Sequence, residues 1–278
     1  MHCGLRLRSP TSRMSSPIVA AASTGGATGM GWPELPVPIS VLSDSYKATH
    51  FAQYPACSKM VAYGEFRAGF SKDTEDVRVV NYGLRYIVER YLHRRWTVQD
   101  VENADHFFSR HCAGSEPLPW PRDLFMKFVK ERDGYFPVKL QALKDGTCCH
   151  IHVPIYQISA EGEYALLCTF LETLLTQVWY PTTVATLSRR VRDIVQDAFE
   201  QAGEGGPDSP LVRSRLHDFG MRGCTCMEQS VIGGCAHLLN FEGTDTMSAA
   251  YFAQYHLNEG RPVGFSIPAT VRVCPSWK

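Results

Sequence analysis

Apolar residues recur at helical spacing from about Pro38 onward, where the ordered region is expected to begin. Stripes at i, i+3, i+4 and i+7 predict a series of amphipathic helices. They cover Leu84 to Leu92, Val101 to Phe108 behind an N-cap at Thr97, Leu124 to Val129 between Pro121 and Gly134, Tyr164 to Trp179, and Val184 to Ala198. Pro181 is expected to end the fourth helix, and a loop from Gly203 to Pro210 follows the fifth.

Shorter apolar runs predict strands. Two are expected at about Val138 to Leu143 and His150 to Ile158, joined by a turn at Asp145-Gly146. After residue 210 short strands alternate with helices: strands at Arg215 to Phe219, Leu239 to Phe241 and Gly264 to Ile267, and helices at Glu228 to Leu238 and Thr246 to His256. This alternation favours parallel pairing in an α/β domain. Ligands of such sheets bind where the strands end, a rim that would carry Phe219, Arg222, Asp245 and Ser266.

Composition narrows the class of protein. The 278 residues are 44% hydrophobic and 20% charged, as in globular proteins, and the formal net charge is zero. No overall field therefore favours nucleic acid or an anionic membrane as a partner. No apolar run reaches eighteen residues, so no transmembrane helix is predicted. The ten cysteines lack the spacing of zinc sites, which favours reduced thiols and no metal site in the chain.

The first 36 residues differ from the rest. They contain Arg6, Arg8 and Arg13 and no acidic residue before Glu34. This composition is typical of an organelle transit segment, and it also fits a disordered extension or a start at a later methionine. A cytoplasmic location is expected, with organelle targeting by residues 1–36 as the alternative.

Four segments carry candidate chemistry: Ser43 to Lys47, His217 to Gly223, Asn240 to Thr246 and Gly264 to Ala269. The second combines an aromatic ring, a carboxylate and a guanidinium that suits phosphate. Each also has a structural interpretation, such as a buried Asp–Arg pair, or a helix cap at Thr244 or Asp245. The local pattern does not rank these interpretations. There is no Walker lysine motif and no GxGxxG, so ordinary nucleotide cradles are not predicted.

Taken in order, these motifs resemble those of nicotinamide phosphoribosyltransferases. The resemblance also includes Thr49-His50, Tyr54-Pro55 and Trp179-Tyr180-Pro181 with Val184-Ala185-Thr186, and it runs from about Pro38 to Thr270. It implies an α/β fold: an incomplete (β/α)-barrel-like phosphoribosyltransferase domain at 161–270, preceded by an N-terminal α+β domain at 37–160. Residues 1–36 would be an extension and residues 271–278 an aberrant tail.

The resemblance also implies roles for particular residues. The enzyme would be a homodimer in which the nicotinamide ring stacks between Phe219 and Tyr46 of the partner subunit. Asp245 and Arg222 would be the catalytic pair, binding the carboxamide NH2 and the carboxamide oxygen or a nearby phosphate. Further residues that would line the substrate sites are Ser266, Ile267, Asp44 and Arg67, of which the last two would face the partner's phosphoribosyl site.

The reaction implied is transfer of a phosphoribosyl group from phosphoribosyl pyrophosphate to nicotinamide, with Mg²⁺ on the leaving pyrophosphate and ATP as a coupled stimulator. Two alternatives stay open. One is a nicotinate enzyme, against which Asp245 argues because it would repel the carboxylate of nicotinate. The other is a truncated, non-catalytic isoform that dimerises with a full-length subunit, since the match stops at Thr270 and Arg272 stands where the family has its phosphorylated histidine.

Overall fold

A computed structural model describes residues 37–69, 76–112, 114–206 and 209–267. The predicted extension at 1–36 and tail at 271–278 lie outside these residues. The chain divides into two compact units, Met1–Thr183 and Val184–Lys278. This division differs from the boundary expected at residue 160, because apolar residues of the 164–178 segment pack into the core of the first unit.

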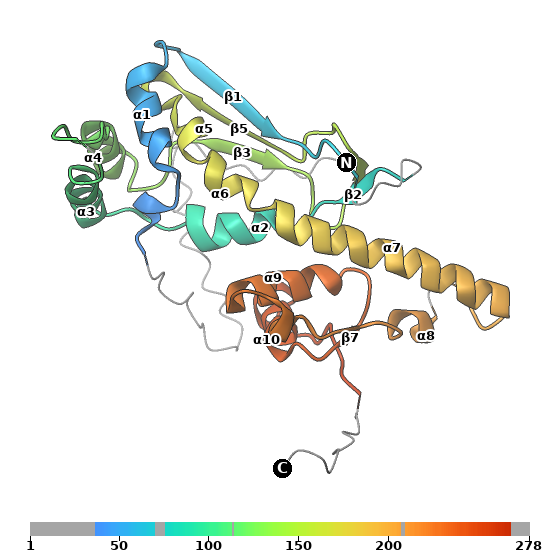
Figure 1. Ribbon diagram of the computed structural model, residues 1–278. Helices are drawn as coiled ribbons and strands as arrows, with labels where there is room; N and C mark the ends of the chain where they lie inside the picture. The colour runs from blue at the N-terminus through green and yellow to red at the C-terminus, as the bar shows by residue number, and fades with distance from the viewer. Residues whose placement is uncertain (1–36, 70–75, 113, 207–208, 268–278) are drawn as a thin grey trace, which may run out of the picture. The chain divides into compact units, whose positions relative to one another are not determined.

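The first unit is built on a small antiparallel sheet with the strand order β1-β5-β3 (Figure 1). The strands are β1 (Lys59–Gly64), β3 (Lys139–Ala142) and β5 (Tyr156–Glu161). Residues of β5 alternate between buried and more exposed, and Tyr156, Ile158 and Ala160 face the core. That alternation is what a strand with one covered face requires. A separate pair, β2 (Arg78–Val80) and β4 (Cys148–His150), is also antiparallel.

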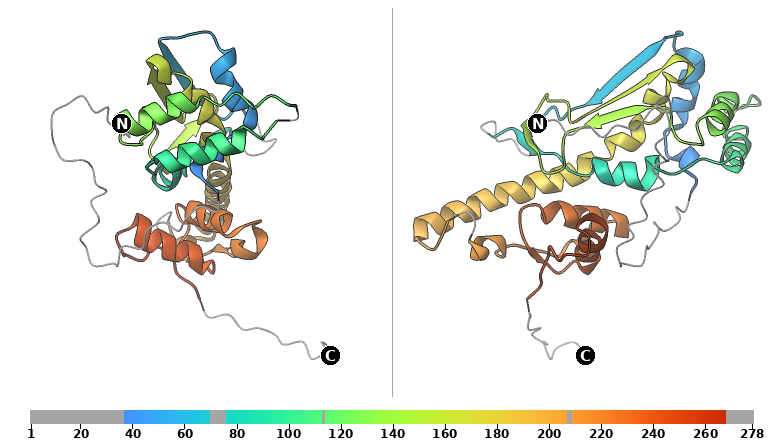
Figure 2. Two further views of the ribbon diagram at one scale, coloured as in Figure 1. Left: turned by 90° about the vertical axis from the view of Figure 1, so that its left-hand side faces the viewer. Right: turned by 180° about the vertical axis from the view of Figure 1, so that it is seen from behind.

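Helices complete the first unit. They are α1 (Ser45–Gln53), α2 (Leu84–Ile87) with a π turn at Val88–Leu92, α3 (Val98–Phe108), α4 (Arg122–Glu131), α5 (Leu167–Phe170) and α6 (Glu172–Thr176). Helices α3 and α4 lie side by side, with α1 next to them, in Figure 1 and in the right-hand view of Figure 2. The predicted cap is confirmed, since Thr97 and Asp100 form a capping box. Aromatic rings fill the core around Trp96, which contacts Phe125, Phe128 and Phe136.

Three predictions for this unit are wrong. The single helix expected from Tyr164 to Trp179 is instead divided into a 3₁₀ turn at Gly162–Tyr164, α5 and α6, and α7 begins at Trp179. The strand expected at His150 to Ile158 is interrupted, because His152 has a φ of 62° and Pro154 follows it. Pro181 does not end a helix; it lies in the first turn of α7 (Trp179–Ala202). A proline is tolerated there because the N–H groups of the first turn have no partner within the helix.

The second unit contains the part of α7 from Val184 on, α8 (Pro210–Arg213), α9 (Met227–His237) and α10 (Met247–Phe252), which a π turn at Ala253–Leu257 extends. Its strands β6 (His217–Asp218) and β7 (Gly243–Thr244) pair in parallel, and Phe265 adds a parallel bridge to Gly243. The parallel pairing predicted from the alternating pattern is thus confirmed. The strand expected at Leu239 to Phe241 is instead a turn that prolongs α9, with the Phe241 N–H donating to the His237 carbonyl oxygen.

Helices α9 and α10 pack closely against each other (Figure 1). Gly234 makes this approach possible, because a Cβ atom there would lie 2.3 Å from the Cβ of Ala249 and 2.9 Å from Oδ2 of Asp218. Gly234 of α9 therefore lies close both to α10 and to the side chain of Asp218 at the end of β6.

Candidate functional site

Asp245 follows β7 directly and is the centre of a hydrogen-bonded group. Ser266 Oγ donates to its Oδ1 over 2.7 Å, and His217 Nδ1 lies 3.2 Å from its Oδ2. Its backbone N–H donates to the Asp218 carbonyl oxygen over 2.8 Å, which ties the two strand ends together. The side chain of Asp245 is 25% exposed, so the carboxylate is accessible from outside.

The same contacts set the charge of this group. Hydrogen bonding from Ser266 is the largest cause and lowers the pKa of the Asp245 carboxyl below its ordinary value; desolvation opposes it, and the hydrogen bond from His217 lowers the pKa further. Asp245 is therefore an anion throughout the physiological pH range. An ionised carboxylate has about four lone-pair sites, and the two contacts occupy only part of them. The group is thus able to accept further hydrogen bonds from a ligand.

The loop after β6 presents an aromatic ring and a guanidinium. Asp218 Oδ1 accepts the N–H of Gly220 over 2.8 Å, which starts the tight 3₁₀ turn Gly220–Gly223. Phe219 is 54% exposed, and the guanidinium carbon of Arg222 lies 6.0 Å from the centre of its ring. A flat ligand could stack on such an exposed face, with the cation beside it. The second unit therefore brings together four of the predicted residues: Phe219, Arg222, Asp245 and Ser266.

In the first unit, Asp44 and Tyr46 lie at the start of α1. The hydroxyl of Thr173 donates to Asp44 Oδ2 over 2.7 Å, and the buried ammonium of Lys47 pairs with the carboxylate of Glu172. That ammonium also lies 4.9 Å from the ring centre of Tyr46, which is 54% exposed. Residues of α6 thus hold Asp44 and Lys47, which lie on either side of Tyr46 in the sequence, while the ring of Tyr46 stays exposed.

Two further predicted residues are exposed. Arg67 lies after β1 in the first unit, and Ile267 is the last described residue of the second, 62% exposed. The predicted positions thus fall on both units, with Asp44, Tyr46 and Arg67 on the first and the others on the second. The sequence motif His217 to Gly223 predicted no separate role for His217.

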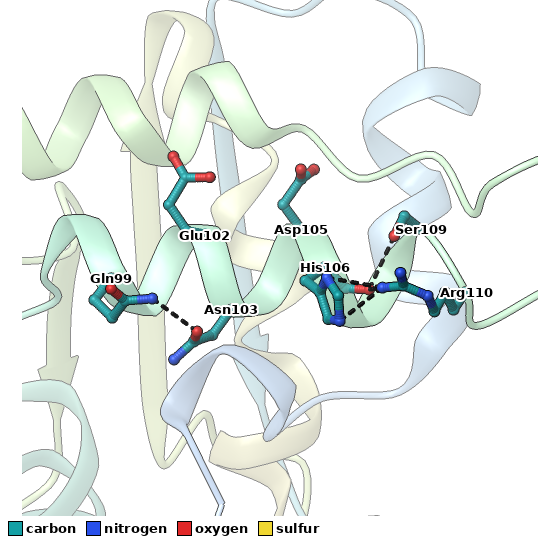
Figure 3. Close-up of a pocket in the computed structure, with 7 residues that line it drawn as sticks. All are labelled: Gln99, Glu102, Asn103, Asp105, His106, Ser109 and Arg110. Carbon is teal, nitrogen blue, oxygen red and sulfur yellow. Dashed lines mark hydrogen bonds between the residues drawn. The ribbon is translucent and has the colours of Figure 1, made fainter.

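A hollow along the outer face of α3 has a different character (Figure 3). It is lined by residues of α3 and by Ser109 and Arg110 just after its end, and two pairs of these residues interact at helical spacing: Gln99 with Asn103, and His106 with Arg110. Pairs at i, i+4 are usual on a solvated helix face. We therefore assign this hollow no function.

The part of the chain that the structure describes also limits the class of protein. Within 37–69, 76–112, 114–206 and 209–267, no group of three or more His, Cys, Asp or Glu side chains is placed to hold a metal ion. Over the same part of the chain no helix has the length and apolar character needed to cross a membrane.

Comparison with known proteins identifies the family that this chain resembles. Residues 38–140 match the model of a family described as "Nicotinamide phosphoribosyltransferase, N-terminal domain". The nicotinamide phosphoribosyltransferase of Xanthomonas campestris pv. campestris is 36% identical over 82% of this chain and 46% of its own length. That of Acinetobacter baylyi is 28% identical over the same shares, 82% and 46%. The chain thus spans about half the length of the curated relatives it matches.

A solved structure extends the likeness to the fold. The crystal structure of human nicotinic acid phosphoribosyltransferase matches 83% of this chain and 39% of its own, with a TM-score of 0.54 and 21% identity. The chain has the mixed α/β fold of a phosphoribosyltransferase, as expected from the sequence. Within that class it is a relative of the nicotinamide phosphoribosyltransferases, so the resemblance read from its motifs is confirmed.

Proposed function

We propose that this chain binds nicotinamide and takes part in transfer of a phosphoribosyl group to it from phosphoribosyl pyrophosphate, giving nicotinamide mononucleotide and pyrophosphate. The observation that carries the proposal is the ionised, accessible carboxylate of Asp245 at the end of β7, whose backbone N–H bonds Asp218, the residue before the exposed Phe219. A flat ring that bears a hydrogen-bond donor is the ligand such a pair recognises. The names of the relatives support the same reaction.

The carboxamide of nicotinamide suits this site on both of its sides. Its NH2 donates to Asp245, and its oxygen accepts from the guanidinium of Arg222. The pyridine ring stacks on Phe219, with Ser266 and Ile267 lining the rim. These roles are proposals; their support is that Ser266 already hydrogen-bonds Asp245 and that the guanidinium carbon of Arg222 lies 6.0 Å from the centre of the Phe219 ring.

Asp245 also favours nicotinamide over nicotinate. Nicotinate carries a carboxylate where nicotinamide carries an amide, and two carboxylates repel each other in a partly desolvated site. Since hydrogen bonds keep Asp245 ionised, protonation does not relieve this repulsion at neutral pH. The likeness to the nicotinic acid enzyme concerns the fold alone and does not change this preference.

A second copy of the chain would complete the site. We propose a homodimer in which Tyr46 of the partner subunit stacks on the other face of the nicotinamide ring, while Asp44 and Arg67 contact the phosphoribosyl donor. The support is the exposed ring of Tyr46, held between Asp44 and Lys47 by two contacts to α6. Tyr46→Ala should weaken nicotinamide binding without changing the oligomeric state in sedimentation; unchanged affinity would exclude this role.

The chemistry places modest demands on the protein. The pyridine nitrogen forms a bond to the anomeric carbon of the ribose, and the bond to pyrophosphate breaks with its electron pair on the leaving oxygen. No proton needs to move, so positioning of the ring and stabilisation of charge supply the rate. Mg²⁺ on the pyrophosphate and ATP as a stimulator are proposed as well. The described residues offer no metal cage, and Mg²⁺ commonly binds through substrate phosphates and water, so no step is assigned to it.

We also propose a cytoplasmic location. The support is the ten cysteines of the sequence, whose spacing matches no zinc site and which are expected to be reduced thiols.

A direct experiment tests the proposed activity. The chain is incubated with nicotinamide, phosphoribosyl pyrophosphate and Mg²⁺, with and without ATP, and nicotinamide mononucleotide is measured by mass spectrometry. Product that disappears in the Asp245→Ala variant supports the proposal. Equal product from both variants, or none from the wild-type chain, contradicts it.

A further inference from the structure

The side chain of His217 lies in a space that fits its imidazole ring. The side chain is only 13% exposed, and it lies against the backbone of the neighbouring strand at Gly243. A Cβ atom on Gly243 would lie 2.6 Å from His217 Cδ2 and 2.9 Å from its Nε2, well inside contact distance. Because glycine has no side chain, the imidazole can lie against Gly243, with its Nδ1 near Asp245.

The backbone of Gly243, against which His217 lies, is itself held by hydrogen bonds. His237 Nε2 lies 3.0 Å from the carbonyl oxygen of Gly243, and its Nδ1 lies 3.2 Å from the hydroxyl of Ser188 on α7. A carbonyl oxygen only accepts hydrogen bonds, so Nε2 carries the proton and donates it. Burial lowers the pKa of His237, which keeps the ring neutral and leaves Nδ1 as an acceptor for Ser188. The backbone under His217 is thus fixed by a buried chain of hydrogen bonds.

The proton between His217 and Asp245 is assigned by the same reasoning. An ionised carboxylate has no proton to donate, so the contact of 3.2 Å requires a hydrogen on Nδ1 of His217. Ser266 donates to the other oxygen of the carboxylate. Two donors on two different oxygens fix the plane of the carboxylate, which a single donor would leave free to rotate.

We propose that His217 is a positioning residue of the nicotinamide site, which holds the Asp245 carboxylate in the plane that receives the ligand's carboxamide. The inference rests on the proposed function and deepens it, because His217 touches Asp245 and need not touch the ligand. A carboxylate ordered in advance loses less conformational freedom when the ligand binds. The preference for nicotinamide over nicotinate then depends on His217 as well as on Asp245.

Three substitutions separate positioning from space filling. His217→Ala removes the donor and should weaken nicotinamide binding about tenfold, the factor that corresponds to ~1.4 kcal/mol. In His217→Asn the side-chain amide places an N–H near the position of Nδ1 and should recover most of the affinity. In His217→Gln the amide reaches the position of Nε2 instead, so this larger side chain should behave like alanine. His106→Ala, on the solvated face of α3, is the control and should bind as the wild type does.

The affinities are measured by calorimetry with nicotinamide and, separately, with nicotinate. Recovery by asparagine but not by glutamine, together with a reduced ratio of the two affinities in His217→Ala, is the expected result. Recovery by glutamine as well as by asparagine would show that His217 only fills space, and no loss in any variant would show that it is dispensable. Either outcome overturns the inference while leaving nicotinamide binding by the wild-type chain intact.

A second measurement needs no ligand. Long-range ¹H–¹⁵N spectra of the imidazole rings, with His217 identified by its absence in His217→Asn, report which nitrogen carries the proton. The expected form is protonated at Nδ1. A ring protonated at Nε2 alone would overturn the inference even if nicotinamide binds, whereas failure of the wild-type chain to bind nicotinamide with Nδ1 protonated would overturn the proposed function and with it the role of His217 toward a ligand.

Discussion

Asp145 makes the stability of the first unit depend on pH. It lies in the turn between β3 and β4, where its Oδ1 accepts the N–H of Gly83 over 3.1 Å. Desolvation by burial raises the pKa of Asp145 from 3.8 to about 6, although the bond to Gly83 and the charge of Arg85 oppose this. The ionised form is therefore less favourable in the folded protein than in the unfolded chain, at ~1.4 kcal/mol for each pKa unit.

The sign follows from proton binding. Between about pH 4 and pH 6 the folded state holds a proton on Asp145 that the unfolded state has lost, so the free energy of unfolding falls as the pH rises through this window. A shift of about two pKa units corresponds to a loss of ~2–3 kcal/mol, complete above about pH 6. Below about pH 4 both states are protonated and the loss is absent.

Asp145→Asn keeps an oxygen that accepts the N–H of Gly83 and removes the buried charge. At pH 7.5 the variant should unfold with a free energy about 1–3 kcal/mol larger than the wild type, and near pH 4 the two should be equal. Urea unfolding followed by circular dichroism at several pH values measures this difference. Asp133→Asn is the control, because that side chain is 88% exposed. A variant no more stable than the wild type at pH 7.5, or a gain that does not vary with pH, would refute the reasoning.

Three further predictions concern packing, capping and reactivity. Gly234→Ala should destabilise the second unit by about 1–3 kcal/mol in urea unfolding, because its Cβ would collide with Ala249, whereas Gly206→Ala, which meets no atom within 4 Å, should change little. Thr97→Ala should cost about 1 kcal/mol by loss of the cap, and a serine there should restore it; equal losses would exclude capping. Burial raises the pKa of the Cys168 thiol to about 11, so iodoacetamide at pH 8 should label the exposed cysteines first and Cys168 only after denaturation, as peptide mass spectrometry would show.

Sequence periodicity predicted most helices, because their buried faces follow the helical repeat. Thr97 and the buried Val101, Ala104 and Phe108 of α3 were placed correctly from spacing and capping rules alone. Pro181 was misplaced because a proline is favourable at the start of a helix and unfavourable inside one, and the sequence does not say which applies. The short strands after residue 210 were found only approximately, since two-residue strands leave almost no periodic signal.

The site was predictable in part. Asp245 and Ser266 were chosen from motifs that lie 21 residues apart, and the structure joins them in one hydrogen bond. His217 was not recognised as their neighbour, because its contact depends on the parallel register that pairs it with Gly243. Register is a property of the folded chain that no local pattern records. The roles of all these residues toward a ligand, and those of Tyr46 and Arg222, stay predictions.

The most direct test of the central claim is the ratio of nicotinamide to nicotinate affinity in the wild-type chain and in Asp245→Ser. Calorimetry with each ligand gives both ratios under the same conditions. The wild type should prefer nicotinamide by about ten- to a hundredfold, the range expected for one hydrogen bond to a charged acceptor, and the serine variant should lose most of this preference. A preference for nicotinamide that is unchanged in Asp245→Ser, or a wild-type chain that binds both ligands equally, would contradict the claim.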